Sequence, residues 1–280
     1  MAASRTLVTG LVDDAALFPP GNAPMPLALA EHALHRRSWY AELVGPFVCP
    51  TSRVAELLAD LAPEAAIDVS LVLDEPAERL GSALGAVGHD ERVTLRGVEA
   101  PLARLGVEAA AVGSEVRRVA SAVGFLEVPR DGVDDTLSLI GGDGWAAAKY
   151  RTGGTTADAF PTENELAAFL AGVAKASVAF KLTAGLHHAV RHTAAETGFE
   201  HHGVLNILVA TADAVSGAPA AEVAETLSHR DPATLVSRIR SLSSDQTTAV
   251  RSLFRSFGCC GVTEPIEDLR ALGVVVEEKS

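Results

Sequence analysis

Ala146-Ala-Ala-Lys149-Tyr-Arg-Thr-Gly-Gly154 is one of two stretches that decide the fold, and the other is Ser177-Val-Ala-Phe-Lys181-Leu-Thr-Ala-Gly-Leu186. Each stretch runs from an apolar, strand-like segment into a Gly/Thr turn, with a lysine near the end of the apolar part. Only four of the 23 basic residues are lysines, so arginine supplies most of the solvated positive charge. Because an unpaired buried ammonium is costly, we take Lys149 and Lys181 as the first candidates for chemistry.

Short apolar runs alternate with Ala/Leu/Glu-rich helical segments on both sides of these stretches. The candidate strands are Leu7–Val12, Glu42–Val48, Asp68–Leu73, Arg92–Val98, Gly124–Val128, Ala146–Tyr150, Ser177–Leu182 and Leu253–Cys259. The candidate helices between them are Pro26–Arg37, Ser52–Leu61, Glu75–Leu84, Pro101–Val119, Asp134–Ile140, Thr162–Lys175 and Glu264–Leu272. The alternation, the length of 280 residues and the lack of a Gly/Ser/Pro-rich linker predict one (βα)8 TIM-type barrel domain over residues 1–280. A doubly wound open sheet is the alternative.

The connection after Lys181 is longer than the others. About 70 residues separate this lysine from the eighth candidate strand, against about 30 elsewhere. Three further helices are expected in it, at Gly203–Val215, Ala220–Leu227 and Asp231–Leu242. We therefore predict a helical insertion over about residues 186–250, serving as a cap or as a contact between subunits of a homo-oligomer.

The composition excludes some functions. With a formal net charge of -13 and an isoelectric point near 5.1, the chain lacks the basic face that nucleic acids and anionic membranes require. No run approaches the roughly 18 apolar residues of a membrane span, and the start has no secretory signal. We expect a cytoplasmic protein whose partner is a small molecule.

Strand alternation sorts the polar residues near the strand ends. In the seventh strand Val178, Phe180 and Leu182 suit a helix layer, which turns Lys181 toward the barrel axis. The polar residues that the same reasoning turns inward are Asp74, Glu127, Lys149, Arg151, Lys181 and Thr183. All of them lie at carboxyl ends of strands, the face where barrel enzymes carry their chemistry.

Two ammonium groups on neighbouring strands are expected to repel each other. Repulsion and partial desolvation both favour the neutral amine, which is the nucleophile in Schiff-base catalysis. The alternative is that both lysines pair with Glu127, Asp74 or Glu99, as structural ion pairs or as substrate anchors.

The turn Lys149-Tyr-Arg-Thr-Gly-Gly and, 32 residues later (181 minus 149), the turn Lys181-Leu-Thr-Ala-Gly-Leu resemble those of class I aldolases of the deoxyribose-phosphate aldolase type. The resemblance implies that Lys149 forms an imine with a carbonyl substrate and that Lys181 lowers the pKa of Lys149. It also implies that an inward carboxylate, such as Glu99 or Glu127, shuttles protons. The likeness covers about 15 residues. Arg151 has no counterpart in the family's turn.

Histidines directly after the seventh strand form a second group of candidate functional residues. His188 and His192 are four residues apart, so on a helix they would share one face and could bind a divalent metal with Asp14 as an oxygen ligand; Glu200 and Asp13 are alternatives. We do not favour a metal, and we expect no cofactor; a role for His187 or His188 as an acid or base fits the spacing better. The three cysteines have no zinc spacing, and the pair Cys259-Cys260 is interpreted as packing residues.

The first candidate strand ends in two acids, Asp13 and Asp14. One of them is expected to point into the barrel mouth, where it could approach Lys181, His187 or His188. The alternative is a turn-stabilising aspartate.

An anionic group on the substrate would bind to the loops after the sixth, seventh and eighth strands. Glycines there allow close backbone approach, and an arginine offers a bidentate fork. The candidates for substrate or anion binding are Arg151, Gly153, Gly154, Thr183, Gly185, Ser256 and Gly258, together with Asp13, Asp14 and Asp74.

These patterns predict an enzyme of small anionic carbonyl metabolites with aldolase or lyase chemistry at a strand-end lysine. The first alternative is a metal-assisted lyase or hydrolase that uses His187, His188 and His192 with Asp13 or Asp14. The second is a barrel that binds a ligand without catalysis.

Overall fold

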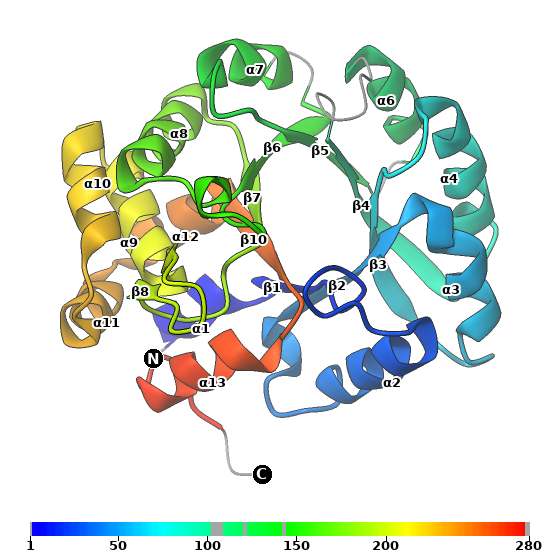
Figure 1. Cartoon of the computed structure of the whole chain (residues 1–280), viewed down its shortest axis with the longest axis horizontal. Helices are drawn as coiled ribbons and strands as arrows, with labels where there is room; N and C mark the ends of the chain where they lie inside the picture. Colours follow the sequence, from blue (N-terminus) through cyan, green and yellow to red (C-terminus); the bar gives the residue numbers. More distant parts are fainter. Residues whose placement is uncertain (1, 102–108, 120–121, 142–143, 278–280) are drawn as a thin grey trace.

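The computed structural model describes residues 2–101, 109–119, 122–141 and 144–277. Within these ranges, eight parallel strands close into a barrel in the order β1-β10-β7-β6-β5-β4-β3-β2. Helices surround the ring of strands (Figure 1). The predicted (βα)8 barrel is therefore confirmed, and the open sheet is excluded.

The barrel strands are β1 (Val12–Asp14), β2 (Val44–Pro50), β3 (Ile67–Val72), β4 (Val93–Ala100), β5 (Val123–Glu127), β6 (Ala146–Arg151), β7 (Phe180–Thr183) and β10 (Phe254–Cys259). The helices are α1 (Ala2–Val8), α2 (Met25–His35), α3 (Val54–Asp60), α4 (Leu80–Gly88), α6 (Ala109–Val116), α7 (Val133–Ile140), α8 (Glu163–Ala176), α9 (Val204–Val215), α10 (Ala220–Ser228), α11 (Pro232–Ser241), α12 (Ser244–Leu253) and α13 (Thr263–Ala271). A small antiparallel pair, β8 (His192–Thr193) and β9 (Glu200–His201), lies outside the barrel sheet.

One expected element needs correction, and other elements were not expected. The run Leu7–Val12 is not one strand, because α1 extends to Val8 and β1 begins only at Val12. Helix α12 and the β8–β9 pair were not predicted. The helix expected over Pro101–Val119 appears as α6, and residues 102–108 lie outside the described residues.

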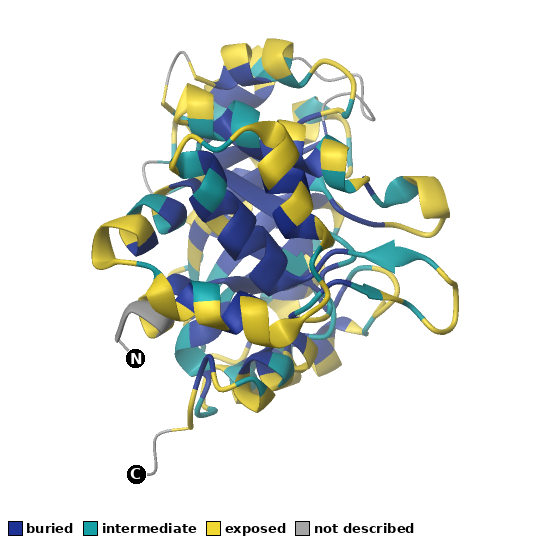
Figure 2. Cartoon of the chain, turned by 90° about the vertical axis from the view of Figure 1, so that its left-hand side faces the viewer, coloured by how far each residue is buried: buried dark blue, intermediate teal, exposed yellow. Residues whose placement is uncertain are grey.

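The core between strands and helices is apolar and aromatic on the side of β6, β7 and β10. Tyr150 stacks on Phe169 of α8 with ring centroids 4.3 Å apart, and Phe180 stacks on Phe254 at 5.0 Å. Tyr150 and Phe180 thus face the helix layer, as the alternation predicted. Figure 2 shows the resulting pattern of buried residues in the middle of the molecule and exposed residues on the outer surfaces of the helices.

The insertion packs beside the barrel and is not a cap over its mouth. Helix α9 contacts α8, α10, α11 and α12, while α12 contacts α1 and β10 (Figure 1). Every residue of α9 from Val204 to Ala212 is buried. The insertion thus completes the helix layer around β7 and β10. No described helix is both long enough and apolar enough to cross a membrane.

Candidate active site inside the barrel

Lys149 and Lys181 lie side by side on neighbouring strands and point into the barrel. The register of β6 and β7 sets the two residues opposite each other. Their exposed fractions are 3% and 1%. Both side chains point inward, as the alternation predicted, and both are buried.

Glu99 of β4 lies between the two amines. Its Oε2 is 2.7 Å from Lys149 Nζ, and its Oε1 pairs with Lys181 Nζ. Ser70 Oγ of β3 donates a 2.9 Å hydrogen bond to Oε1 of this carboxylate. One carboxylate therefore joins the two lysines, which is the pairing that the sequence left open as an alternative.

Asp13 of β1 is the second carboxylate in this group. Its Oδ2 accepts hydrogen bonds of 2.7 Å from both Lys181 Nζ and Ser256 Oγ. Its Oδ1 is buried without a hydrogen-bond partner, and a Cβ placed on Gly45 would lie only 2.2 Å from it. We call the whole group the lysine cluster, and its members are Asp13, Ser70, Glu99, Lys149, Lys181 and Ser256.

The charges in the lysine cluster set its protonation. Burial alone would raise the pKa of Glu99, but Lys149 and Lys181 outweigh it and lower this pKa to about 2. Burial would lower the pKa of Lys181, but Asp13 and Glu99 raise it. Burial raises the pKa of Asp13 in spite of its contact with Lys181. The expectation of two neutral amines is therefore wrong for Lys181, which is held as an ammonium.

Two residues predicted to face inward lie apart from the lysine cluster. Asp74 follows the end of β3 and is exposed; its carboxylate accepts from Thr51 Oγ1, Ser52 N and Ser52 Oγ. It therefore fixes the start of the connection after β2. Glu127 Oε1 is 3.5 Å from Arg151 Nε, and Glu127 Oε2 is buried without a partner.

The glycines of the two lysine turns pack against each other. A Cβ on Gly153 would lie 2.8 Å from the Cα of Gly185, and a Cβ on Gly185 would lie 2.8 Å from the carbonyl oxygen of Thr152. Gly185 also has a φ of +77°, which disfavours other residues. These glycines let the turns after β6 and β7 touch.

The remaining anion-binding candidates are distributed differently. A Cβ on Gly154 would lie 2.6 Å from the Cβ of Ala159, so this glycine also serves packing. Ser256 and Gly258 lie within β10, not in the loop after it, and Ser256 points to Asp13. Thr183 ends β7 and pairs in register with Gly258. The expectation that Ser256 contributes to an anion loop is wrong.

The predicted metal set of His188, His192 and Asp14 does not assemble. Asp14 points to the helix layer, where its Oδ2 is 2.9 Å from His32 Nδ1 of α2. His188 Nδ1 is 3.0 Å from Asp268 Oδ2 of α13. The rings of His188 and His192 do meet edge to face, 4.5 Å apart, but the chain between them is not helical. Alternation along β1 explains this, since only Asp13 can face inward.

A different group of three metal-capable side chains comes together at the rim. Among the described residues, only His187, Cys259 and Glu264 bring three such donor atoms within 4.8 Å of one another. His187 Nδ1 is 2.5 Å from Glu264 Oε2 and 3.8 Å from Cys259 Sγ, and Cys260 Sγ is 3.8 Å from His187 Nε2. The sulfurs of both cysteines therefore contact the imidazole of His187, a neighbour that the sequence did not indicate.

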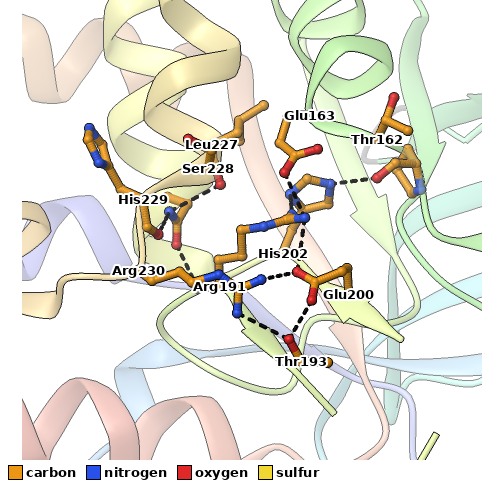
Figure 3. A network of polar contacts seen from close by, with 12 residues as sticks. Thr162, Glu163, Arg191, Thr193, Glu200, His202, Leu227, Ser228, His229 and Arg230 are labelled. Atoms are coloured by element: carbon orange, nitrogen blue, oxygen red, sulfur yellow. Dashed lines mark hydrogen bonds and ion pairs between the residues drawn. The ribbon is translucent and has the colours of Figure 1, made fainter. Parts of the chain in front are cut away.

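His202 belongs to a polar network beside the barrel (Figure 3). Arg191 pairs with Glu163 of α8 at 2.7 Å and with Glu200 of β9 at 3.1 Å. Its NH1 lies 3.3 Å from Nδ1 of His202, whose Nε2 is 2.8 Å from the carbonyl oxygen of Pro161. Asn206 of α9 accepts from the Arg191 backbone N–H and donates to carbonyl oxygens of residues 226, 227 and 229. We call Glu163, Arg191, Glu200, His202 and Asn206 the Arg191 cluster.

Two residues with buried polar contacts were not among the sequence candidates, and the sequence contained a signal for one of them. Ser70 lies between the outward residues Val69 and Leu71 of β3, so the alternation already turned it inward. His32 of α2 is the buried partner of Asp14, and its position carries no comparable signal.

No protein-family model matches this chain, and no curated protein sequence matches it significantly. Any functional assignment therefore rests on the arrangement of the residues. A closed (βα)8 barrel with polar groups at the carboxyl ends of its strands is compatible with an enzyme.

Proposed function

We propose that this protein is an enzyme of small anionic carbonyl metabolites and that Lys149 forms a Schiff base with the substrate. The observation that carries the proposal is that the Glu99 carboxylate pairs with both lysines, whereas the second carboxylate, Asp13, pairs with only one of them. Lys181 has a second carboxylate, Asp13, whereas the ion pair of Lys149 is with Glu99. This asymmetry favours Lys181 as the permanent cation and Lys149 as the nucleophile.

Glu99 is placed to move the protons of imine formation. The charge of Lys149 is the main cause that lowers the pKa of Glu99, so Glu99 becomes more basic as it takes the proton from Lys149. The neutral amine adds to the substrate carbonyl to form a carbinolamine. Glu99 then returns the proton to the carbinolamine hydroxyl, which leaves as water and gives the iminium. The Lys181 ammonium, 2.7 Å from Asp13, holds positive charge beside the reacting centre throughout.

The burial of the lysine cluster favours a small substrate. Since Lys149 is only 3% exposed, a molecule that reaches it must enter between the side chains at the carboxyl end of the barrel. Arg151 lies two residues beyond Lys149 on β6, with 40% of its side chain exposed, and it offers a guanidinium to an anionic group of the substrate.

The test is borohydride reduction of the protein mixed with a panel of aldehydes and 2-oxo acids, followed by peptide mass spectrometry. We expect a reduced adduct on Lys149, and we expect none in Lys149→Met. Lys175→Arg is the matched control, since this exposed lysine in the last turn of α8 is not a member of the lysine cluster and should leave trapping unchanged.

Two results would count against the proposal. An adduct on Lys181 would reverse the roles of the two lysines. No adduct on either lysine with any member of the panel would end the Schiff-base mechanism and leave a barrel that binds without covalent catalysis.

A further inference from the structure

The side chains of His187, Cys259 and Glu264 converge from three separate segments at the carboxyl end of the barrel. His187 follows β7, Cys259 ends β10, and Glu264 lies in the first turn of α13. The backbone of Cys259 is fixed, because its carbonyl oxygen accepts a hydrogen bond from Ala15 N. Cys259 also pairs in register with Asp14 of β1. None of these three residues belongs to the lysine cluster.

Nδ1 of His187 is close to the donor atoms of both other residues. Cys259 Sγ is 3.8 Å from it and Glu264 Oε2 is 2.5 Å from it. Around a tetrahedral zinc ion, a sulfur and a nitrogen ligand would lie about 3.5 Å apart, given their usual bond lengths to the metal. The sulfur and the imidazole thus already stand at nearly the required separation.

The carboxylate of Glu264 has room to make the remaining adjustment. To bind the same ion as His187, its oxygen must withdraw by about 1 Å from the imidazole nitrogen. Half of the Glu264 side chain is exposed, so solvent leaves it free to turn. Gly261 lies next to it, and a Cβ there would come within 2.6 Å of Glu264 Oε2.

We propose that His187 Nδ1, Cys259 Sγ and Glu264 form a zinc-binding site with one open coordination position at the rim of the barrel. The mixed nitrogen, sulfur and oxygen donors suit Zn²⁺, whereas magnesium and calcium prefer oxygen alone. Three protein ligands leave the fourth position to water or to an oxygen of a bound molecule. Cys260 Sγ, 3.8 Å from Nε2, holds the other edge of the imidazole and orients it without binding the ion.

Cobalt titration of the metal-stripped full-length protein tests this site without any assay of activity. We expect one Co²⁺ per chain, with a thiolate-to-metal charge-transfer band in the near ultraviolet, intense visible bands of a four-coordinate ion, and displacement by Zn²⁺. Cys259→Ser should remove the charge-transfer band and weaken binding by about a hundredfold or more, because it removes a ligand that binds the ion directly.

Matched neighbours provide the controls. Cys260→Ser should keep the band and lose no more than about tenfold in affinity, because its sulfur only orients the ring. His187→Gln should abolish binding, while His188→Gln, whose imidazole contacts Asp268, should not. Gly261→Ala should weaken binding by crowding Glu264, and circular dichroism establishes that each variant is folded.

The proposal is overturned if the stripped protein binds no Co²⁺, or if it binds Co²⁺ without a charge-transfer band. It is equally overturned if the band survives in Cys259→Ser and disappears in Cys260→Ser. These outcomes are independent of borohydride trapping at Lys149, so failure of one proposal does not decide the other.

Discussion

The lysine cluster inside the barrel and the Arg191 cluster beside it both bury positive charge, but only one of them retains access to water. In the lysine cluster the side chains of Glu99, Lys149 and Lys181 are at most 4% exposed. In the Arg191 cluster the arginine side chain is 7% exposed, while its carboxylates, Glu163 and Glu200, are 31% and 41% exposed. Removing one partner therefore strands a charge in the first region, whereas solvent can replace it in the second.

The two regions also differ in how completely their polar atoms are satisfied. Asp13 Oδ1 has no partner, and the lysine cluster depends on one carboxylate to bridge two ammonium groups. Asn206 of the Arg191 cluster uses its oxygen and its nitrogen, and His202 uses both of its ring nitrogens. The Arg191 cluster is therefore the more completely hydrogen-bonded of the two, whereas the lysine cluster contains one buried acceptor without a partner.

The largest expected effect comes from the matched substitutions Glu99→Gln and Glu163→Gln. Glu99→Gln leaves two buried ammonium groups with only Asp13, so the free energy of unfolding should fall by about 3–5 kcal/mol. Glu163→Gln should lower it by less than about 1 kcal/mol, because Arg191 keeps Glu200 and its partners reach solvent. Urea unfolding at neutral pH measures both. Equal losses would mean that the two clusters do not differ in the way described.

Acidification should loosen the Arg191 cluster before the lysine cluster. Burial lowers the pKa of His202 to about 4, below its ordinary value near 6.5, so its unfolded form binds the proton first. The contribution of neutral His202 to the free energy of unfolding is therefore complete above about pH 6.5. It decreases as the pH falls toward 4, by up to about 1.4 kcal/mol per pH unit. Glu99, with a pKa of about 2 against 4.5, contributes stability that is lost only below about pH 4.5.

Hydrogen-exchange protection between pH 7 and 4.5 measures which of the two clusters loosens first. Protection should fall around residues 200–204 while the amides of β4 and β6 keep theirs. In His202→Gln the fall near residues 200–204 should be much smaller. If protection near residues 200–204 and protection of β4 and β6 are lost at the same pH, the predicted order of the two clusters is wrong.

A smaller effect is expected from Gly45→Ala. The new Cβ would lie 2.2 Å from Asp13 Oδ1, so the aspartate must move, and the free energy of unfolding should fall by about 1–3 kcal/mol. Gly85→Ala in α4 is the control, because a Cβ there meets nothing within 4 Å and alanine favours the helix. Thermal unfolding compares the two. If Gly45→Ala is as harmless as its control, Asp13 is less constrained than the structure indicates.

The sequence predicted best what depends on local alternation. Inward Lys149 and Lys181 follow from the period of two along β6 and β7, and one inward acid follows from adjacent Asp13 and Asp14. The partners of Asp74, Thr51 and Ser52, were not predicted, because they lie in the connection after another strand. The division of Leu7–Val12 was missed because a short apolar run fits a helix or a strand.

Contacts across the barrel and between loops could not be predicted in this way. Glu99 reaches both lysines because strand stagger sets which residues meet inside the ring, and no local pattern gives that stagger. The meeting of His187 with Cys259 and Glu264 depends on the paths of two loops. Because His187 is far from Cys259 and Glu264 in the sequence, the three residues form no short metal-binding motif.

The closure of the ring by β10 also has a consequence for biosynthesis. Asp13 leaves the ribosome before its partner Lys181, which follows 168 positions later. Ser256, which also donates to Asp13, and the strand that pairs with β1 emerge later still. Until β10 has been synthesised, Asp13 therefore lacks the hydroxyl of Ser256, and β1 lacks one of its two neighbouring strands.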